Sequence, residues 1–211
     1  MKIAFIGYGH VGGALADHLQ RLGHEVALAA DDASSESVRK ALARNSGLRT
    51  SATKAAVRAA DVVFLATPFQ ANESVLAGIA GELAGKVLID CTNPVGPRLS
   101  HGLRSAQSGS ETVQTLAPDA KVVKAFSIYG FENFEDSGYP AYNVKPAMLF
   151  CGNDAMAKKT AAALIAGLGW EPFDVGGLEQ ALHLEHMTLL WVRMVRVDGH
   201  SPNMVWAVLK R

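Results

Sequence analysis

Short runs of consecutive apolar residues alternate along most of the chain with longer segments in which apolar residues recur at helical spacing. The short runs predict buried strands at Lys2–Ile6, Glu25–Ala30, Val62–Ala66, Val87–Asp90, Val122–Ala125 and Met148–Cys151. The longer segments predict helices at Val11–Leu22, Ala71–Leu83 and Ala155–Leu168, and the polar segment Ser105–Ser110 predicts a loop. Continuous apolar strands separated by helices are typical of parallel sheets that are covered on both faces. We therefore expect an α/β fold with a doubly wound, mainly parallel sheet.

The last part of the chain predicts one more strand and then helices. Trp170–Val175 has the pattern of a strand, Leu178–Val197 that of a long amphipathic helix, and Met204–Leu209 that of a short final helix. We divide the chain into a sheet domain, residues 1–177, and a short C-terminal helical extension, residues 178–211, which together form one compact unit. The apolar side of the long helix packs either on its own sheet or on a second copy in a homodimer.

Composition excludes several classes of protein. Among 211 residues, Lys plus Arg and Asp plus Glu each total 20, so the formal net charge is zero and no nucleic-acid partner is expected. Hydrophobic residues make up 49% of the chain, which is enough for a large core and argues against disorder. The two cysteines, Cys91 and Cys151, do not form a disulfide scaffold. They fit a reducing compartment, so we expect a cytoplasmic protein.

The sequence predicts neither a membrane span nor a signal peptide. It contains no run of about 18 apolar residues, the length that a membrane helix needs. A signal peptide needs about 7–15 continuous apolar residues. The apolar N-terminal stretch is interrupted by Gly7, Gly9, His10, Gly12 and Gly13.

The segment Gly7-Tyr8-Gly9-His10-Val11-Gly12 carries the strongest functional pattern in the chain. It follows the first predicted strand directly and opens the first predicted helix. The second strand then leads to Asp31, nineteen residues beyond Gly12. This order of strand, glycine loop, helix, strand and acidic residue is the dinucleotide-binding fingerprint of Rossmann-type folds. The expected fold class is therefore an α/β Rossmann-type fold with a short C-terminal helical extension.

Each glycine of this segment has a physical role in holding a dinucleotide. Gly7 allows a tight turn, Gly9 leaves room for the pyrophosphate, and Gly12 lets the helix approach the sheet. The free N–H groups and the dipole of the helix start then face the phosphates. The alternative is a glycine-rich turn without a ligand. The expected pyrophosphate-binding residues are Gly7, Gly9, His10, Val11 and Gly12.

Asp31 bears on the choice between NAD and NADP. A carboxylate at the end of the second strand accepts hydrogen bonds from the adenosine ribose and repels a 2′-phosphate. Asp32 adds to that repulsion. Arg39 and Lys40 are either solvated charges on a helix or cations that fold back toward a phosphate. We expect NAD as the preferred cofactor, with NADP as the alternative.

The chain resembles the NAD(P)H-dependent oxidoreductases related to the F420-dependent NADP reductase, which exchanges hydride between NADP and the deazaflavin coenzyme F420. The N-terminal domain of six-transmembrane metalloreductases is similar. The resemblance covers nearly the full length and implies a flavin, F420 or another small redox acceptor as the second substrate. Beyond the glycine loop it is carried by Leu22–Val26, Asp61–Pro68, Asp90–Pro94, Val122–Phe126 and Gly177–Trp191.

The resemblance also implies site residues at the ends of later strands. Positions beside the cofactor would be Thr67, Pro68, Asn93 and Pro94. The resemblance further implies that Phe126 lies near the reaction face. Independently of the resemblance, Phe69 and Phe126 would offer a flat apolar wall to an acceptor ring, and Ser127 and Tyr129 are candidate polar groups near the cleft. These places agree with the rule that ligands bind at the carboxyl ends of parallel strands. The alternatives are ordinary turn chemistry for the Thr-Pro and Asn-Pro pairs and core packing for the aromatic residues.

Two departures from the family pattern affect the expected substrates. Family members typically carry Ser-Arg after the second strand, where this chain has Ala30-Asp31, and this difference favours NAD. The Lys-Ala-Phe motif is usually followed by Asn, where this chain has Ser127, so the acceptor stays open.

No catalytic residue and no metal site are predicted. Hydride transfer between two bound cofactors needs alignment and exclusion of water more than an acid or base. Glu179, His183 and His186 share a helix face but lack a zinc-binding pattern. Cys91 is either a nucleophile at a strand end or a small buried hydrophobe.

We therefore predict an NAD(P)-dependent oxidoreductase. One alternative is a dinucleotide-binding module that senses redox state without turnover. A second is a reductase of imines or 2-hydroxy acids, although few residues follow Gly177 to build a helical substrate domain.

Overall fold

A computed structural model describes residues 1–211 and arranges them around one eight-stranded sheet. The strands are β1 (Lys2–Ile6), β2 (Glu25–Ala29), β3 (Arg49–Ser51), β4 (Val62–Leu65), β5 (Val87–Asp90), β6 (Lys121–Lys124), β7 (Ala147–Gly152) and β8 (Glu171–Asp174). Their order across the sheet is β3-β2-β1-β4-β5-β6-β7-β8. Every neighbouring pair is parallel except β6 and β7. The Rossmann-type, mainly parallel sheet expected from the sequence is confirmed.

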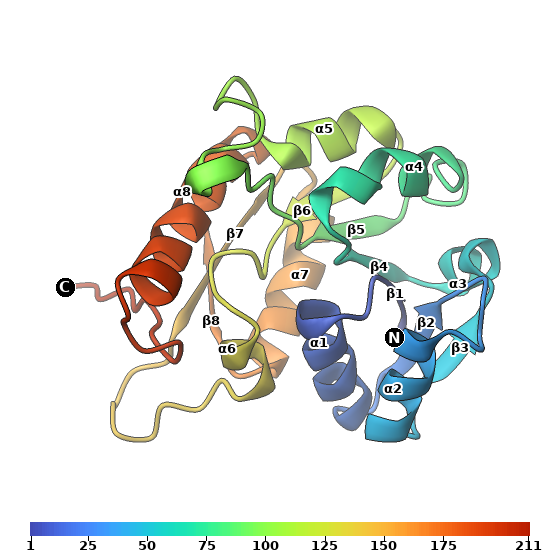
Figure 1. Ribbon diagram of the computed structural model, residues 1–211, viewed down its shortest axis with the longest axis horizontal. Helices are drawn as coiled ribbons and strands as arrows, with labels where there is room; N and C mark the ends of the chain where they lie inside the picture. The colour runs from blue at the N-terminus through green and yellow to red at the C-terminus, as the bar shows by residue number, and fades with distance from the viewer.

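Helices cover both faces of the sheet (Figure 1). They are α1 (His10–Arg21), α2 (Glu36–Arg44), α3 (Thr53–Ala59), α4 (Asn72–Ala77), α5 (Gly109–Leu116), α6 (Glu132–Glu135), α7 (Ala155–Gly167) and α8 (Ala181–Val192). Short helical turns adjoin two of them: η1 (Phe69–Ala71) precedes α4, and η3 (Leu178–Gln180) and η4 (Arg193–Val197) flank α8. A further turn, η2 (Pro97–Leu99), stands alone in the loop before α5. None of the helices combines the length and the apolar character that crossing a bilayer requires.

Alternation along the strands creates two separate cores. In β1, Ile3 and Phe5 belong to the core beneath α1, α2 and α7, whereas Ala4 and Ile6 belong to the core beneath α3, α4 and α5. The first core is larger, with 33 buried residues against 17, and α8 contributes Ala181, Leu184 and Trp191 to it. Burial on both faces is the physical reason why the central strands are continuously apolar.

The strand order creates a crevice at the carboxyl ends of the central strands β1 and β4. From β1 the chain proceeds outward to β2 and β3, and then returns to β4 on the other side of β1. The loops that follow β1 and β4 therefore diverge to opposite faces. Such a switch point, at the carboxyl ends of the strands, is the usual ligand-binding place in doubly wound sheets.

The C-terminal part confirms one predicted helix and corrects another. The segment Leu178–Val197 is helical, as η3, α8 and η4. The predicted final helix Met204–Leu209 is wrong, because no helix follows Val197. The N–H of Ala147 donates to the carbonyl of Trp206 (2.8 Å), and the N–H of Trp206 donates to the hydroxyl of Tyr129 (3.0 Å). These bonds to the body of the protein replace the internal bonds that a helix would make.

The apolar pattern missed strand β3 and helices α2, α3, α5 and α6. Strand β3 has only three residues at the sheet edge, too few to form a recognisable run. Helix α5 begins at Gly109, inside the predicted loop Ser105–Ser110. A capping box starts it: Ser108 Oγ accepts from the N–H of Glu111 (3.0 Å), and Glu111 Oε2 accepts from the N–H of Ser108 (2.8 Å).

Candidate cofactor site

The loop between β1 and α1 has the geometry that its glycines predict. Gly7 has φ 86°, and a Cβ there would lie 2.6 Å from the carbonyl carbon of Ala66. A Cβ on Gly12 would collide with the carbonyl oxygen of Gly7. A Cβ on Gly9 would meet nothing within 4 Å. Gly7 and Gly12 thus serve the turn and the helix–sheet contact, whereas Gly9 leaves open space in front of the helix start.

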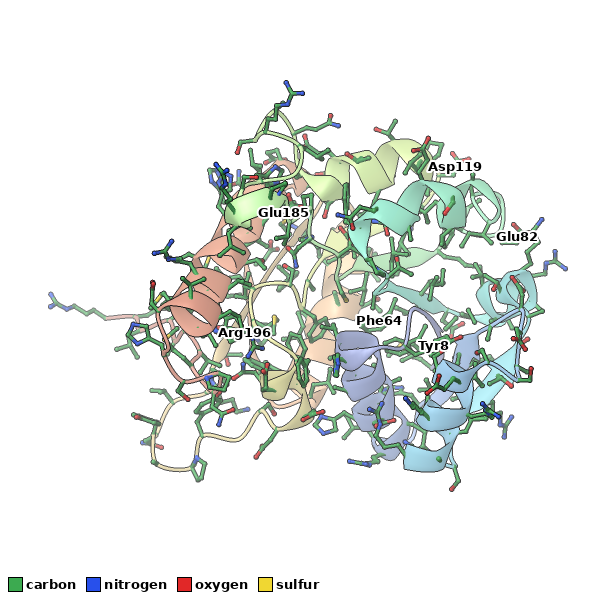
Figure 2. The ribbon with its side chains drawn as sticks, viewed as in Figure 1. Tyr8, Phe64, Glu82, Asp119, Glu185 and Arg196 are labelled. Carbon is green, nitrogen blue, oxygen red and sulfur yellow. The ribbon has the colours of Figure 1, made fainter.

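A cleft of about 630 Å³ lies in front of this loop, at the carboxyl ends of β1, β2 and β4. Of the predicted cofactor residues, it is lined by Gly7, Gly9, Asp31 and Thr67. Figure 2 shows Tyr8, another lining residue, beside the first turn of α1. The cleft occupies the switch point of the sheet, so the fold and the glycine loop indicate the same place for a ligand.

Asp31 is held at the end of β2 with part of its carboxylate unused. Its Oδ1 accepts from the N–H of Thr53 (2.8 Å), and Oδ2 receives no hydrogen bond from the protein. The next residue, Asp32, binds both the N–H and the hydroxyl of Ser34, and these hydrogen bonds lower the pKa of Asp32 below its ordinary value. The carboxylate of Asp31 therefore lines the cleft, whereas Asp32, next to it in the chain, does not.

Four polar residues of the cleft were not found from the sequence. They are Ser37, Thr53, Lys54 and Ser74. Thr53 and Lys54 open α3, directly after the short strand β3, and this strand was the part of the apolar pattern that could not be recognised. Arg39 and Lys40 do not line the cleft. Lys40 pairs instead with Glu36 on the exposed side of α2 (2.7 Å).

Other predicted cofactor residues lie next to the cleft without lining it. His10 is exposed and stacks on Phe131, with ring centroids 4.4 Å apart. Val11 packs against the core under α1, and Pro68 is exposed before η1. Thr67 lines the cleft, but its hydroxyl donates to Asn72 Oδ1 (2.8 Å). Its side chain therefore holds the start of α4 in addition to facing the ligand space.

Both ends of the Asn93 side-chain amide have a partner in the protein. Its Nδ2 donates to the carbonyl of Ser127 (3.2 Å), and its Oδ1 lies 3.1 Å from the hydroxyl of Thr188 on α8, which is also a donor to the Ser127 carbonyl. The amide thus joins the loop after β5 to the loop after β6 and to α8. One of the two hydrogens on Nδ2 has no partner, so the amide keeps one donor for a ligand.

The four predicted acceptor residues fall into two groups. Phe69 and the cofactor-side residue Pro94 are in the wall of a second cavity, about 620 Å³, between α4, α5 and the loop after β5. Phe126, Ser127 and Tyr129 are packed inside the protein, 1%, 2% and 4% exposed. The hydroxyl of Ser127 has no hydrogen-bond partner, which leaves one buried polar group beside Asn93.

The candidate metal and nucleophile positions lack the necessary surroundings. Glu179, His183 and His186 form no cluster that could hold a metal ion. Burial and the neighbouring carboxylate of Asp90 raise the pKa of the Cys91 thiol, so it stays protonated at neutral pH. Burial likewise raises the pKa of Cys151 to about 12. Both cysteines behave as small hydrophobes.

A group of ionisable residues that the sequence analysis did not single out is fully buried beside the second cavity. We call it the charge cluster; its members are Asp90, His101, Lys124 and Glu185. Lys124 Nζ lies 3.3 Å from Asp90 Oδ2 and 3.4 Å from Glu185 Oε1, and His101 Nε2 lies 2.7 Å from Glu185 Oε2. The sequence hint was a charge in an apolar setting, since Lys124 closes an apolar strand and Glu185 follows Leu184 in an apolar helix.

Comparisons with known proteins connect this site to a family. Residues 2–94 match the family described as NADP oxidoreductase, coenzyme F420-dependent. The chain is 34% identical over 135 residues to the metalloreductase STEAP3 of Rattus norvegicus, a match that covers 64% of this chain and 26% of that protein. It is 31% identical over 145 residues to the F420-dependent NADP reductase of Methanocaldococcus jannaschii, covering 66% of this chain and 64% of the relative. The chain thus spans less than two thirds of either relative.

A solved structure extends the likeness to the whole chain. It is that of a candidate F420-dependent NADP reductase from Arthrobacter sp. FB24, which superposes with a TM-score of 0.88 and 28% identity over 100% of both chains. The family resemblance inferred from the sequence is confirmed.

Proposed function

The chain is a relative of the coenzyme F420-dependent NADP oxidoreductases, and we propose that it is itself an NAD(P)H-dependent oxidoreductase. It would transfer hydride between a nicotinamide dinucleotide and a flavin, a deazaflavin such as F420, or another small redox acceptor. The observation that supports this most is the single cleft that brings Gly9 and Asp31 together at the switch point of the sheet. The free cysteines fit a reducing cytoplasm. A homodimer contact would form on exposed Leu190 and Val197 of α8 and η4.

The residues of the cleft would hold the dinucleotide in extended form. The pyrophosphate would lie over Gly9, against the N–H groups at the start of α1, and the adenosine ribose would lie at Asp31. The nicotinamide would then lie past Thr67, toward the loop that carries Asn93 and Pro94. Nicotinamide supplies the hydride when it is bound, so the protein's task is to align the two rings and to exclude water.

We propose that NAD is preferred because Asp31 lines the ribose end of the cleft and Asp32 follows it in the chain, against one cation in the wall. Asp31 and Asp32 would repel a 2′-phosphate, although Lys54 in the same wall would attract it. The double variant Asp31→Ser, Asp32→Arg should shift the ratio of the NADH and NADPH dissociation constants at least about tenfold in favour of NADPH. Two repulsive charges are lost and one attractive charge is gained.

Fluorescence titration with both reduced cofactors at one salt concentration measures this ratio. Lys54→Ala is the matched control and should weaken the binding of NADPH while leaving the dissociation constant of NADH nearly unchanged. A parent that binds NADPH more tightly than NADH would contradict the role given to Asp31.

We propose that the acceptor lies against Phe69, in the cavity between α4 and α5. Gln70 is exposed and lines this cavity, and it is not among the residues that line the dinucleotide cleft. A Gln70→Trp variant should therefore oxidise NADH at least about tenfold more slowly with a flavin or deazaflavin acceptor, and should bind NADH as the parent does.

Stopped-flow absorbance at 340 nm with FMN, F420 and a quinone as acceptors gives the rate. Unchanged rates in Gln70→Trp would place the acceptor elsewhere. A parent that binds NADH but passes hydride to none of these acceptors would instead support a redox-sensing module without turnover.

A further inference from the structure

We propose that Glu185, through the charge cluster, is a positioning residue for the nicotinamide half of the cofactor. The inference rests on the proposed function. The cluster joins α8 and the start of α5 to the loop after β5, which carries Asn93 and Pro94. Figure 2 shows Glu185 on the side of α8 that faces α5.

The loop after β5 is held by charged side chains at its first turn. Asp90 Oδ1 accepts from the N–H of Thr92 (2.9 Å) and from its hydroxyl (2.7 Å). The ammonium group of Lys124 donates to the carbonyl oxygen of Thr92. Both backbone polar groups of Thr92 are therefore bound to charges. The conformation of the next two residues, which would border the nicotinamide, depends on where Asp90 and Lys124 are held.

Glu185 fixes the opposite side of the same region. Its Oε1 accepts from the N–H of Gly109 (2.9 Å) at the first residue of α5. Gly109 is in close contact with the cavity wall: a Cβ on it would lie 2.8 Å from the ring of Phe69 and 3.1 Å from Pro94 Cδ. Glu185 thus holds the start of α5 next to Phe69 of the proposed acceptor site and next to Pro94 in the loop after β5.

The hydrogen bonds of His101 show that the carboxylate form of Glu185 is required. The Nδ1 atom of His101 accepts from the N–H groups of Leu103 (3.3 Å) and Ser105 (3.2 Å). Its ring hydrogen therefore lies on Nε2, which donates to Glu185 Oε2, and the ring is neutral. Glu185 Oε2 then accepts from His101, Oε1 faces Lys124, and the N–H of Gly109 is shared between the two oxygens (2.9 Å to Oε1 and 3.0 Å to Oε2).

A glutamine at this position would keep the shape but not the bonding. Its amide has one acceptor oxygen. In the place of Oε2, that oxygen would still accept from His101 and Gly109, but the amide nitrogen would then face the ammonium group of Lys124. In the place of Oε1, it would leave the buried His101 Nε2–H without an acceptor. Either Lys124, which holds the carbonyl of Thr92, or the His101 loop would therefore have to move. By contrast, the pyrophosphate and ribose positions at Gly9 and Asp31 share no hydrogen bond with the cluster. The two halves of the cofactor should therefore respond differently.

The test compares NADH with ADP-ribose, which lacks the nicotinamide, by calorimetry. In Glu185→Gln, we expect ADP-ribose to bind as in the parent and NADH to bind about tenfold more weakly. The exposed Glu179→Gln, which removes the same charge one turn before α8, is the matched control and should change neither constant. With a deuteride at C4 of NADH, the primary isotope effect on acceptor reduction should also change in Glu185→Gln only.

The outcomes separate the two claims. If the parent binds neither ADP-ribose nor NADH, the proposed function itself fails. The positioning role is overturned if the parent binds both ligands and Glu185→Gln keeps the parent ratio of the two dissociation constants, whether both constants stay unchanged or both rise equally. Should Glu185→Gln not fold, Ser110→Ala decides. It removes the bond from Ser110 Oγ to Asp90 Oδ2 (2.5 Å) without removing a charge. We expect about threefold weaker NADH binding with unchanged ADP-ribose, and equal ratios would overturn the proposal.

Discussion

A Gly9→Glu variant is expected to fold with the stability of the parent and to bind NADH at least about 100-fold more weakly, a loss of ~3 kcal/mol. Gly9 directly precedes the first residue of α1 with a negative φ of −71°, and a Cβ there meets nothing within 4 Å. The added side chain would extend into the open space that the pyrophosphate is proposed to fill. Its carboxylate would also neutralise the positive helix start and repel the phosphates.

Calorimetry with NADH and ADP-ribose, together with thermal unfolding, checks this expectation. Gly81→Glu is the matched control, because a Cβ on this exposed glycine also meets nothing within 4 Å and Gly81 lies outside the cleft wall. It adds the same charge and should leave both constants unchanged. A Gly9→Glu protein that binds both ligands as tightly as the parent would remove the pyrophosphate from this loop and with it the proposed function.

Lys124→Met should give the largest loss of stability, about 3–5 kcal/mol in the free energy of unfolding at pH 7. Methionine fills a similar volume, so the expected effect is electrostatic. Without the ammonium group, Asp90 and Glu185 would be two buried carboxylates with no cation between them. The carbonyl of Thr92 would lose its charged donor as well. Urea unfolding, with the midpoint and slope compared between variant and parent, measures the loss.

Lys121→Met on the same strand is the control. Its side chain is 41% exposed and pairs with Asp154 at 3.3 Å, so its removal should cost less than about 1 kcal/mol. Equal costs for Lys124→Met and Lys121→Met would mean that the buried cation contributes no more than a surface ion pair.

The pH dependence of this difference has a definite sign. Burial by itself would lower the pKa of Lys124, but the charges of Asp90 and Glu185 outweigh it and raise that pKa above the ordinary 10.5. A cation whose pKa is raised by folding stabilises the protein fully below its unfolded value and loses that contribution as the pH rises through the folded value. The gap in stability between parent and Lys124→Met should therefore stay constant from neutral pH to about pH 9 and narrow in strong alkali.

The glycine loop shows which parts of the site were accessible from the sequence. The positive φ of Gly7 and the contact of Gly12 with the carbonyl of Gly7 are local, and spacing predicted both, although the close approach of Gly7 to Ala66 comes from the neighbouring strand β4. Asp31 was found because it stands at a fixed distance along the same β–α–β unit. Lys54 shares its cleft but follows β3, a three-residue edge strand that buries too little apolar surface to leave a pattern.

The C-terminal residues show the opposite case. Met204–Leu209 has helical spacing, yet Trp206 binds through its backbone to Ala147 and Tyr129, more than fifty residues away in the chain. Propensity is a weak prior when partners of this kind are available. The start of α5 was missed for a related reason, because a capping box of polar residues resembles a loop until its hydrogen bonds are seen.

By itself, the sequence determined the doubly wound sheet, the glycine loop and the acidic residue after β2, because each follows from burial or backbone conformation within one short segment. Only the tertiary structure decided that Asn93 has its amide bound to Ser127 and Thr188, that Phe126 and Tyr129 are in the core, and that Glu185 lies against Lys124 and His101. Such contacts join side chains that are distant in the chain. A buried charge is stable only where its partner arrives from another element, and local pattern carries no information about that partner.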